Sequence, residues 1–128
     1  SDDHAIILGE HLKHPFILKR IVGQSGMSYG ALGNNASTDL AKCLAIAGTR
    51  MNTGEGGLSE YHLKGNGEII FHIGPGLFVV RDKEVNFSEG LFKEVAQLSN
   101  VRAFELKLAQ GAKTRGGHME AEKVIEEI

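Results

Sequence analysis

Residues 101–118 constrain the fold more than any other stretch, because an alternating strand runs directly into a glycine-rich, cationic loop. Phe104, Leu106 and Leu108 alternate with small or polar residues, so the strand predicted over residues 101–109 has one apolar face. An amphipathic surface strand would show the same alternation. The loop favours a ligand site instead, because barrels and open α/β folds bind ligands at the carboxyl ends of their strands.

The composition excludes several classes of function. A chain of 128 residues with 41% hydrophobic and 23% charged residues is typical of one soluble globular domain. The net charge of −2 provides no electrostatic footprint for nucleic acid or for an anionic membrane surface. The single cysteine permits no internal disulfide and favours a reducing compartment. No apolar run approaches a membrane span and the start does not resemble a signal peptide, so we expect a cytoplasmic protein.

The chain ahead of residue 101 repeats the pattern of a strand followed by a glycine-rich loop. Residues 1–16 are predicted to be a lead-in segment with room for a short helix, because Pro15 discourages one continuous helix. The histidines of this segment have no carboxylate or cysteine at a supporting spacing, so we expect no metal site. The further strands are predicted over residues 17–22 and 49–52, and their glycine-rich loops over residues 23–33 and 53–57.

Helices are predicted between these strands. The first starts at Ser37 and stops at Gly48, and its apolar face consists of Leu40, Cys43, Leu44 and Ala47. Cys43 is expected to be a small core residue on that face, since no histidine lies near it in the sequence. The second helix is capped by Ser88 and ends at Asn100 in a left-handed conformation, and its apolar stripe consists of Leu91, Phe92, Val95 and Leu98.

Two further elements complete the predicted order. Residues 68–80 are rich in β-branched and aromatic side chains and are interrupted at residues 74–76 by Gly-Pro-Gly, which predicts a hairpin or a pair of short strands around a turn. Residues 118–128 have an apolar helical face. Strands separated by helices indicate parallel pairing with right-handed crossovers. Because an eight-stranded barrel typically needs about 250 residues, we expect this chain to be one part of such a fold.

Three motifs, in this order and spacing, resemble the FMN-binding synthase domain of the glutamate synthase large-subunit family. They are MSYGAL at residues 27–32, NTGEGG at residues 52–57 and ELKLAQGAK at residues 105–113. The resemblance covers residues 17–128 and implies an α/β fold, a partial (β/α)8 TIM-type barrel of about three strand–helix units with a β-hairpin insertion. KTRGGH at residues 113–118 is similar to the stand-alone bacterial members, which lack a fused glutaminase domain.

The resemblance implies an oxidoreductase that transfers a hydride from reduced FMN to 2-iminoglutarate. That imine forms from 2-oxoglutarate and ammonia, or ammonia derived from glutamine. The phosphate group of the cofactor in such barrels is usually held by the loops after strands seven and eight. A complete FMN site therefore implies the remaining half of the barrel as a partner.

The resemblance also assigns roles to individual residues. Lys107 matches the lysine at the N1 and O2 edge of the flavin, where a fixed cation favours the anionic reduced ring. Glu55 matches a carboxylate near the ammonia entry side, and these two residues are the expected catalytic pair. The other matches are Met27 and Ser28 against the flavin, Thr53 bordering the same site, Lys113 on the carboxylates of 2-oxoglutarate, and Gln110 as a polar positioning group between the two sides of the site.

Three departures from the family pattern are visible. The cysteine run that ligates an iron–sulfur cluster in the large synthases is absent, and Cys43 stands alone, so we expect no such cluster in this chain. His72 occupies a position that is usually glutamine. Val79 occupies a position that is usually glycine, and a positive φ there would strain a valine by about 1–2 kcal/mol.

Two alternatives stay open beside the enzyme. The chain could be a non-catalytic folding or interaction module, which would self-associate through unpaired strands and exposed apolar patches. It could also belong to another FMN-binding or phosphate-binding barrel, because glycine-rich loops after strands are common to many of them.

Overall fold

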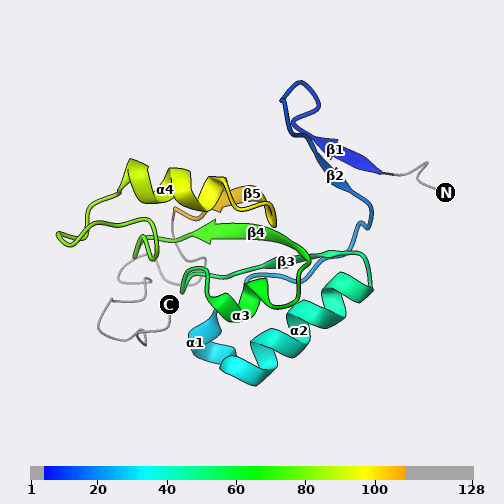
Figure 1. The fold of residues 1–128 in the computed structure, drawn as a ribbon, viewed down its shortest axis with the longest axis horizontal. Coiled ribbons are helices and arrows are strands. Elements are labelled where there is room, and N and C mark those ends of the chain that lie inside the picture. Colours follow the sequence, from blue (N-terminus) through cyan, green and yellow to red (C-terminus); the bar gives the residue numbers. More distant parts are fainter. Residues whose placement is uncertain (1–4, 109–128) are drawn as a thin grey trace.

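The structure is a computed structural model that describes residues 5–108. These residues form a three-stranded parallel sheet, a separate antiparallel strand pair and four helices (Figure 1). The predictions for residues 109–117 and 118–128, including those for Gln110 and Lys113, lie outside this part of the chain. In order along the chain, the elements are β1 (Ile6–Leu8), β2 (Phe16–Leu18), α1 (Tyr29–Leu32), α2 (Asn34–Ile46), β3 (Arg50–Asn52), α3 (Glu60–Leu63), β4 (Glu68–Ile73), α4 (Glu89–Ala96) and β5 (Val101–Leu106).

The parallel sheet has the strand order β3-β4-β5, with β4 in the middle. Helix α3 lies in the connection from β3 to β4, and α4 lies in the connection from β4 to β5. This confirms the α/β class with parallel strands. Within the described residues the three strands form an open sheet and no closed barrel. None of the helices in this part of the chain is long and apolar enough to cross a membrane.

The core lies between β4, β5 and α4. Ile69, Phe71 and Ile73 alternate along β4 and are almost fully buried, together with Val95 of α4 and Val101 of β5. Three aromatic rings extend this layer: Phe104 meets Phe71 edge-on at 6.0 Å and packs against Phe92 of α4 at 4.5 Å between ring centroids. The apolar face predicted for the last strand thus packs on a helix at Phe104, whereas Leu106 and Leu108 are exposed among the described residues.

Helix α2 packs on the turn between α3 and β4 through small residues. A Cβ atom at Gly65 would lie 2.4 Å from the backbone of Ala41, and one at Gly67 would lie 3.0 Å from Cβ of Ala45. Only glycine therefore allows the helix to approach this closely. In Figure 1, α2 lies with α1 and α3 on the β3 side of the sheet, while α4 lies along the side of β4 and β5.

The strand predicted over residues 17–22 is wrong in extent and in pairing. Strand β2 pairs antiparallel with β1 in a separate two-stranded sheet, and this pairing replaces the short helix expected in the lead-in segment. The backbone carbonyls of Arg20 and Ile21 accept hydrogen bonds from the Arg50 guanidinium, and that of Val22 accepts one from the Thr49 hydroxyl. These carbonyls are therefore bonded to side chains and not to a neighbouring strand.

The predicted hairpin over residues 68–80 is also wrong. Strand β4 ends at Ile73, and the chain then makes successive turns in which Leu77 N–H donates to the Gly74 carbonyl. Leu77 and Val79 have φ of 53° and 73° in these turns, a conformation that no strand contains. The backbone strain expected at Val79 is thus confirmed. The positive φ angles of these turns prevent residues 77–79 from forming a strand.

The helix predictions are confirmed in part. Ser88 caps α4, because its Oγ accepts a hydrogen bond from Leu91 N–H, but the helix ends at Ala96 and Asn100 is not left-handed. Asn100 instead donates to the Gly67 carbonyl.

Helix α2 starts at Asn34, one turn before the predicted Ser37, and Gly48 follows its end with φ of 69°. Its buried face consists of Ser37 and Ala41, with Leu40 and Leu44 partly buried. Cys43 and Ala47 are exposed, so the core role expected for Cys43 is wrong. The close approach to the glycines on the α3–β4 turn selects small side chains for the buried face, which the count of apolar residues did not anticipate.

His62 is a buried histidine at the start of α3. Its Nδ1 accepts a hydrogen bond of 3.0 Å from the Ser59 backbone N–H and therefore caps the helix in reciprocal fashion. The side chain is 1% exposed, and this burial lowers the pKa of His62 from 6.5 to about 4. The ring is consequently neutral in the folded protein at any pH well above 4.

Acid should destabilise the fold through His62. Below pH 6.5 the unfolded chain binds a proton at this ring, while the folded chain does not until the pH approaches 4. The free energy of unfolding should therefore fall by about 3 kcal/mol from this group as the pH decreases from 6.5 to 4. His62→Gln keeps an acceptor for the Ser59 N–H and removes the titration. Urea unfolding from pH 4 to 7.5 should show a shallower pH dependence in the variant, and equal slopes would contradict this account.

Positive φ angles at two valines predict opposite mutational outcomes. Val85 has φ of 65° and is 55% exposed, so Val85→Gly relieves backbone strain and loses little packing. We expect a gain of about 0.5–1 kcal/mol in the free energy of unfolding. Val79 has a similar φ but packs against the core, so Val79→Gly should gain less or lose stability. Urea unfolding of both variants measures the difference, and a loss for Val85→Gly would sink the strain argument.

Candidate functional site

A cavity of about 290 Å³ lies where the carboxyl ends of the three parallel strands meet. The residues that follow β3, the end of β4 and the residue after β5 all contribute to it, and the loop ahead of α1 covers it. Its lining consists of Gly26, Met27, Ser28, Ala31, Gly54, Glu55, His72 and Lys107. The strand pairing therefore brings together residues that are up to 81 positions apart, from Gly26 to Lys107.

Two glycines allow the loop of residues 26–28 to lie directly on the end of β3. Gly54 has φ of 71°, and a Cβ atom there would lie 2.6 Å from the Ser28 nitrogen. A Cβ at Gly26 would lie 3.3 Å from the Gly54 Cα. The Asn52 side chain fixes this turn, because its Oδ1 accepts a hydrogen bond from Gly54 N–H. Backbone atoms thus form much of the cavity wall.

Lys107 and Glu55 face each other across the cavity. The Lys107 Nζ lies 3.9 Å from Glu55 Oε2, and the side chains are 33% and 11% exposed. Glu55 packs against Gly74, where a Cβ would lie 2.5 Å from its Cγ. A buried carboxylate needs an opposite charge close by, and Lys107 supplies it. The pair places one cation and one anion at the strand ends.

His72 and Thr53 form the floor beneath this pair. Thr53 is fully buried, and its hydroxyl accepts a hydrogen bond of 3.0 Å from the His72 backbone N–H and donates to the Gly54 carbonyl. The His72 ring is 7% exposed, and its Nδ1 lies 2.9 Å from Oε1 of Glu105 on β5. Its Nε2 is buried without a hydrogen-bond partner among the described residues.

Of the site residues predicted from sequence, Met27, Ser28, Glu55 and Lys107 line one cavity. Thr53 lies directly behind it and supports its floor, and Gln110 and Lys113 lie outside the described residues. Sequence reasoning singled out His72 only as a departure from a family pattern and gave Glu105 no role. The signal that could have marked His72 is its place as a polar residue inside the otherwise apolar run of β4.

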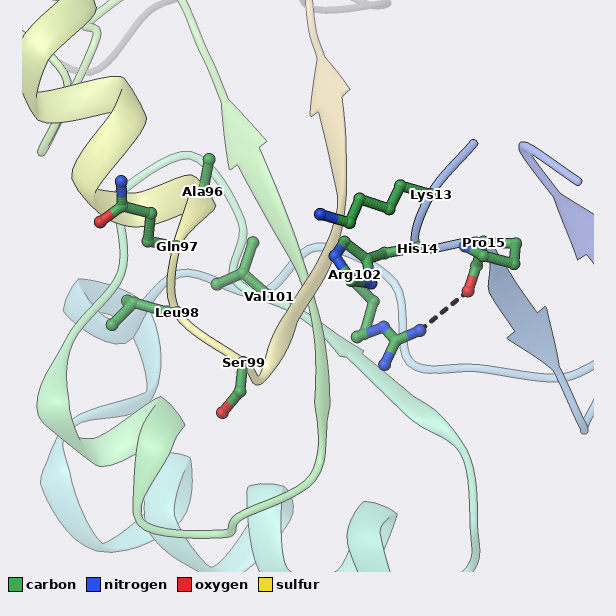
Figure 2. A pocket seen from close by; sticks show the side chains of 9 residues that line it. All are labelled: Lys13, His14, Pro15, Ala96, Gln97, Leu98, Ser99, Val101 and Arg102. Carbon is green, nitrogen blue, oxygen red and sulfur yellow. Dashed lines mark hydrogen bonds between the residues drawn. The ribbon is translucent and has the colours of Figure 1, made fainter. Parts of the chain in front are cut away.

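A second hollow, of about 470 Å³, lies at the amino end of β5 (Figure 2). Lys13, His14 and Arg102 lie there, and the Arg102 guanidinium donates a hydrogen bond of 2.9 Å to the Pro15 carbonyl. Figure 2 also shows the last residues of α4 at its rim. Cations at a helix carboxyl terminus complement its exposed carbonyls. The hydrogen bond from Arg102 therefore attaches the segment ahead of β2 to the sheet.

Comparison with known proteins gives one family and several relatives. The chain matches the family described as "Conserved region in glutamate synthase" over residues 1–128. It is 58% identical over 128 residues to the glutamate synthase large subunit-like protein YerD of Bacillus subtilis. The aligned region covers 98% of this chain and 24% of that protein. It is 39% identical over 103 residues to the archaeal glutamate synthase [NADPH] of Methanocaldococcus jannaschii. That aligned region covers 80% of this chain and 18% of that protein.

More distant relatives show the same pattern of coverage. The glutamate synthase large subunit-like protein of Rhizobium meliloti is 27% identical over 91% of this chain and 24% of that protein. The chain thus spans about a quarter or less of the length of these curated relatives. No solved structure matches it.

Gly54→Ala should separate the loop from the strand end. The new Cβ would lie within 2.7 Å of two backbone atoms of residues 27 and 28, at a φ that alanine disfavours. We expect a loss of about 2–3 kcal/mol in the free energy of unfolding. Gly30→Ala is the matched control, because nothing lies within 4 Å of its added Cβ in α1. Urea unfolding should leave the control unchanged or slightly stabilised, and equal effects of the two substitutions would refute the close contact.

Proposed function

The chain belongs to the glutamate synthase family, and we propose that it is part of an FMN-dependent, glutamate synthase-like oxidoreductase. This proposal rests on one observation. Met27, Ser28, Glu55 and Lys107 line the same cavity at the ends of parallel strands. The proposed substrates are 2-oxoglutarate and ammonia, either free or derived from glutamine. The bound cofactor supplies a hydride to the C=N carbon of 2-iminoglutarate.

The residues around the cavity fit a flavin ring. Gly26 and Gly54 allow backbone atoms to approach a flat ring closely. The volume of about 290 Å³ is at the lower limit of ligand pockets, which span about 300–1,000 Å³. This chain would therefore hold one side of the ring, with the phosphate group held by strands beyond it.

Lys107 would act on the electronics of the ring. Its ammonium group is fixed by Glu55, so a permanent positive charge stands at the strand ends. A fixed cation stabilises negative charge that develops on the flavin during reduction. Glu55 in turn presents a carboxylate on the side proposed for ammonia entry. Lys113 and Gln110 are proposed to bind and position 2-oxoglutarate.

The remaining strands of the barrel would complete the site. Among the described residues β5 pairs only with β4, so its other edge is open to a further strand. Leu106 and Leu108 beside that edge are 65% and 84% exposed. The same surface favours the second candidate function, a non-catalytic module that self-associates. We propose the cytoplasm as the location.

A chimaeric protein tests the proposal. Residues 1–128 of this chain replace the matching segment of the Bacillus subtilis relative, to which they are 58% identical. We expect the purified chimaera to contain FMN and to form glutamate from 2-oxoglutarate and ammonium with a chemical reductant of the flavin. A folded chimaera without FMN, from a parent that contains it, would reject the proposal. Self-association of the 128-residue chain without flavin binding by the chimaera would support the second candidate.

Lys107→Met in the chimaera tests the role of the fixed cation. We expect the flavin to stay bound, its reduction potential to fall and glutamate formation to decrease by about 100-fold. Lys93→Met is the matched control, because Lys93 pairs with Glu89 on the exposed surface of α4. Spectroelectrochemical titration of both variants measures the potential. An unchanged potential in Lys107→Met would remove Lys107 from the mechanism.

A further inference from the structure

His72 is the one buried ionisable side chain of the cavity to which the family resemblance assigns no role. Its backbone N–H donates a hydrogen bond to the Thr53 hydroxyl, and its ring contacts the Glu105 carboxylate through Nδ1 at 2.9 Å. Gly26 covers the ring, because a Cβ there would lie 3.5 Å from Nδ1. The ring therefore has little freedom to rotate.

The contact with Glu105 favours a proton on Nδ1 of the neutral ring. A carboxylate accepts hydrogen bonds, so it stabilises the tautomer in which Nδ1 of His72 carries the proton. In the neutral ring Nε2 is then a bare acceptor, and in the charged ring it is a donor. The contact is short but is not aligned as a hydrogen bond. Such contacts between acid–base groups commonly align only when substrate binds.

The free nitrogen of this ring is the second observation. Nε2 is buried and has no hydrogen-bond partner among the described residues, in a side chain that is 93% buried and lines the cavity. An unsatisfied buried polar atom costs about 1–3 kcal/mol. A substrate that donates a proton to Nε2, or accepts one from it, would remove that cost.

The charges around the ring suit ammonium. Glu105 of β5 contacts the ring, and Glu55 after β3 lines the same cavity and pairs with Lys107. The covering loop, residues 26–28, carries no ionisable side chain. The ring thus has one carboxylate, Glu105, in contact with Nδ1, and it shares its cavity with a second, Glu55, that is already paired with Lys107.

We propose that His72 is the acid–base residue that forms the imine, with Glu105 as the residue that positions it. This inference rests on the proposed function, and it assigns to His72 the condensation of ammonium with the oxo acid. The glutamine that the family resemblance implies at this position would offer hydrogen bonds but could not transfer a proton at neutral pH. The histidine therefore adds a chemical step to what is otherwise a binding position.

The step balances in atoms and charge. Ammonium gives a proton to Nε2 and becomes ammonia, whose nitrogen bonds to the carbonyl carbon of 2-oxoglutarate. A proton then moves from that nitrogen to the oxygen, which gives a neutral carbinolamine. Imidazolium returns its proton to the hydroxyl, the C–O bond breaks, water leaves and the nitrogen lone pair completes the C=N bond. One ammonium and one ketone yield one iminium and one water, and the imidazole is regenerated.

The first experiment measures the tautomer of His72 in the 128-residue chain. Long-range ¹H–¹⁵N correlation spectra identify the protonated nitrogen, and His72→Gln assigns the signals. We expect the neutral ring to carry its proton on Nδ1, and Glu105→Ala to shift the proton towards Nε2. Glu105 is about half exposed, so this variant should fold. Glu94→Ala, an exposed carboxylate of α4, is the matched control. A proton on Nε2 in the unmodified chain would overturn the proposal.

The second experiment follows imine formation without flavin chemistry. The chimaera receives 2-oxoglutarate, ammonium and cyanoborohydride, which reduces the imine to glutamate. His72→Gln should lower the protein-dependent rate by about 100-fold and remove its pH dependence, while Glu94→Ala leaves both unchanged. An equal rate in His72→Gln overturns the assignment even if the chimaera binds FMN. A chimaera without FMN that still shows the His72-dependent rate would reject the proposed function and leave this inference standing.

Discussion

The parallel pairing of β4 with strands on both of its edges is the constraint on which the site depends. Because β4 is bonded on both edges, its residues alternate strictly between two faces. Ile69, Phe71 and Ile73 bury one face against α4 and β5, which leaves His72 to face the loop that precedes α1. The same pairing aligns the ends of β3 and β5, so Glu55 and Lys107 meet without any direct sequence signal between them.

The sequence predicted the parts of the site that depend on local chemistry. Gly54 was recognisable because a turn directly after a strand needs a glycine, and Lys107 because its strand alternates. Family resemblance then assigned both to one site. The sequence could not predict that Arg50 and Thr49 would bind the carbonyls of residues 20–22, because such bonds between a side chain and a distant backbone leave no periodic pattern. These bonds hold residues 20–22 outside the sheets, although the composition of these residues favours a strand.

The helix errors have a different physical origin. For α2, hydropathy selected Cys43 and Ala47 as buried, whereas the buried residues are Ser37 and Ala41, and the α3–β4 turn lies directly on Ala41. Packing that depends on small size is invisible to a count of apolar residues. For residues 77–80, the composition is rich in β-branched side chains and favours a strand. Leu77 and Val79 nevertheless have positive φ angles, which strands do not contain. Tertiary contacts decided both cases, and the buried Phe78 and Val80 lie in turns as a result.

The loop above the cavity is fastened at both of its ends. Arg50 and Thr49 hold the carbonyls of residues 20–22, and Gly23 packs on the Arg50 side chain. At the other end, residues 27 and 28 rest on Gly54. A segment clamped in this way changes shape little when a ligand arrives, so the wall of the cavity is preorganised and its binding entropy cost is reduced. Arg50 thereby holds, from the first residue of β3, the loop that covers the cavity at the other end of the strand.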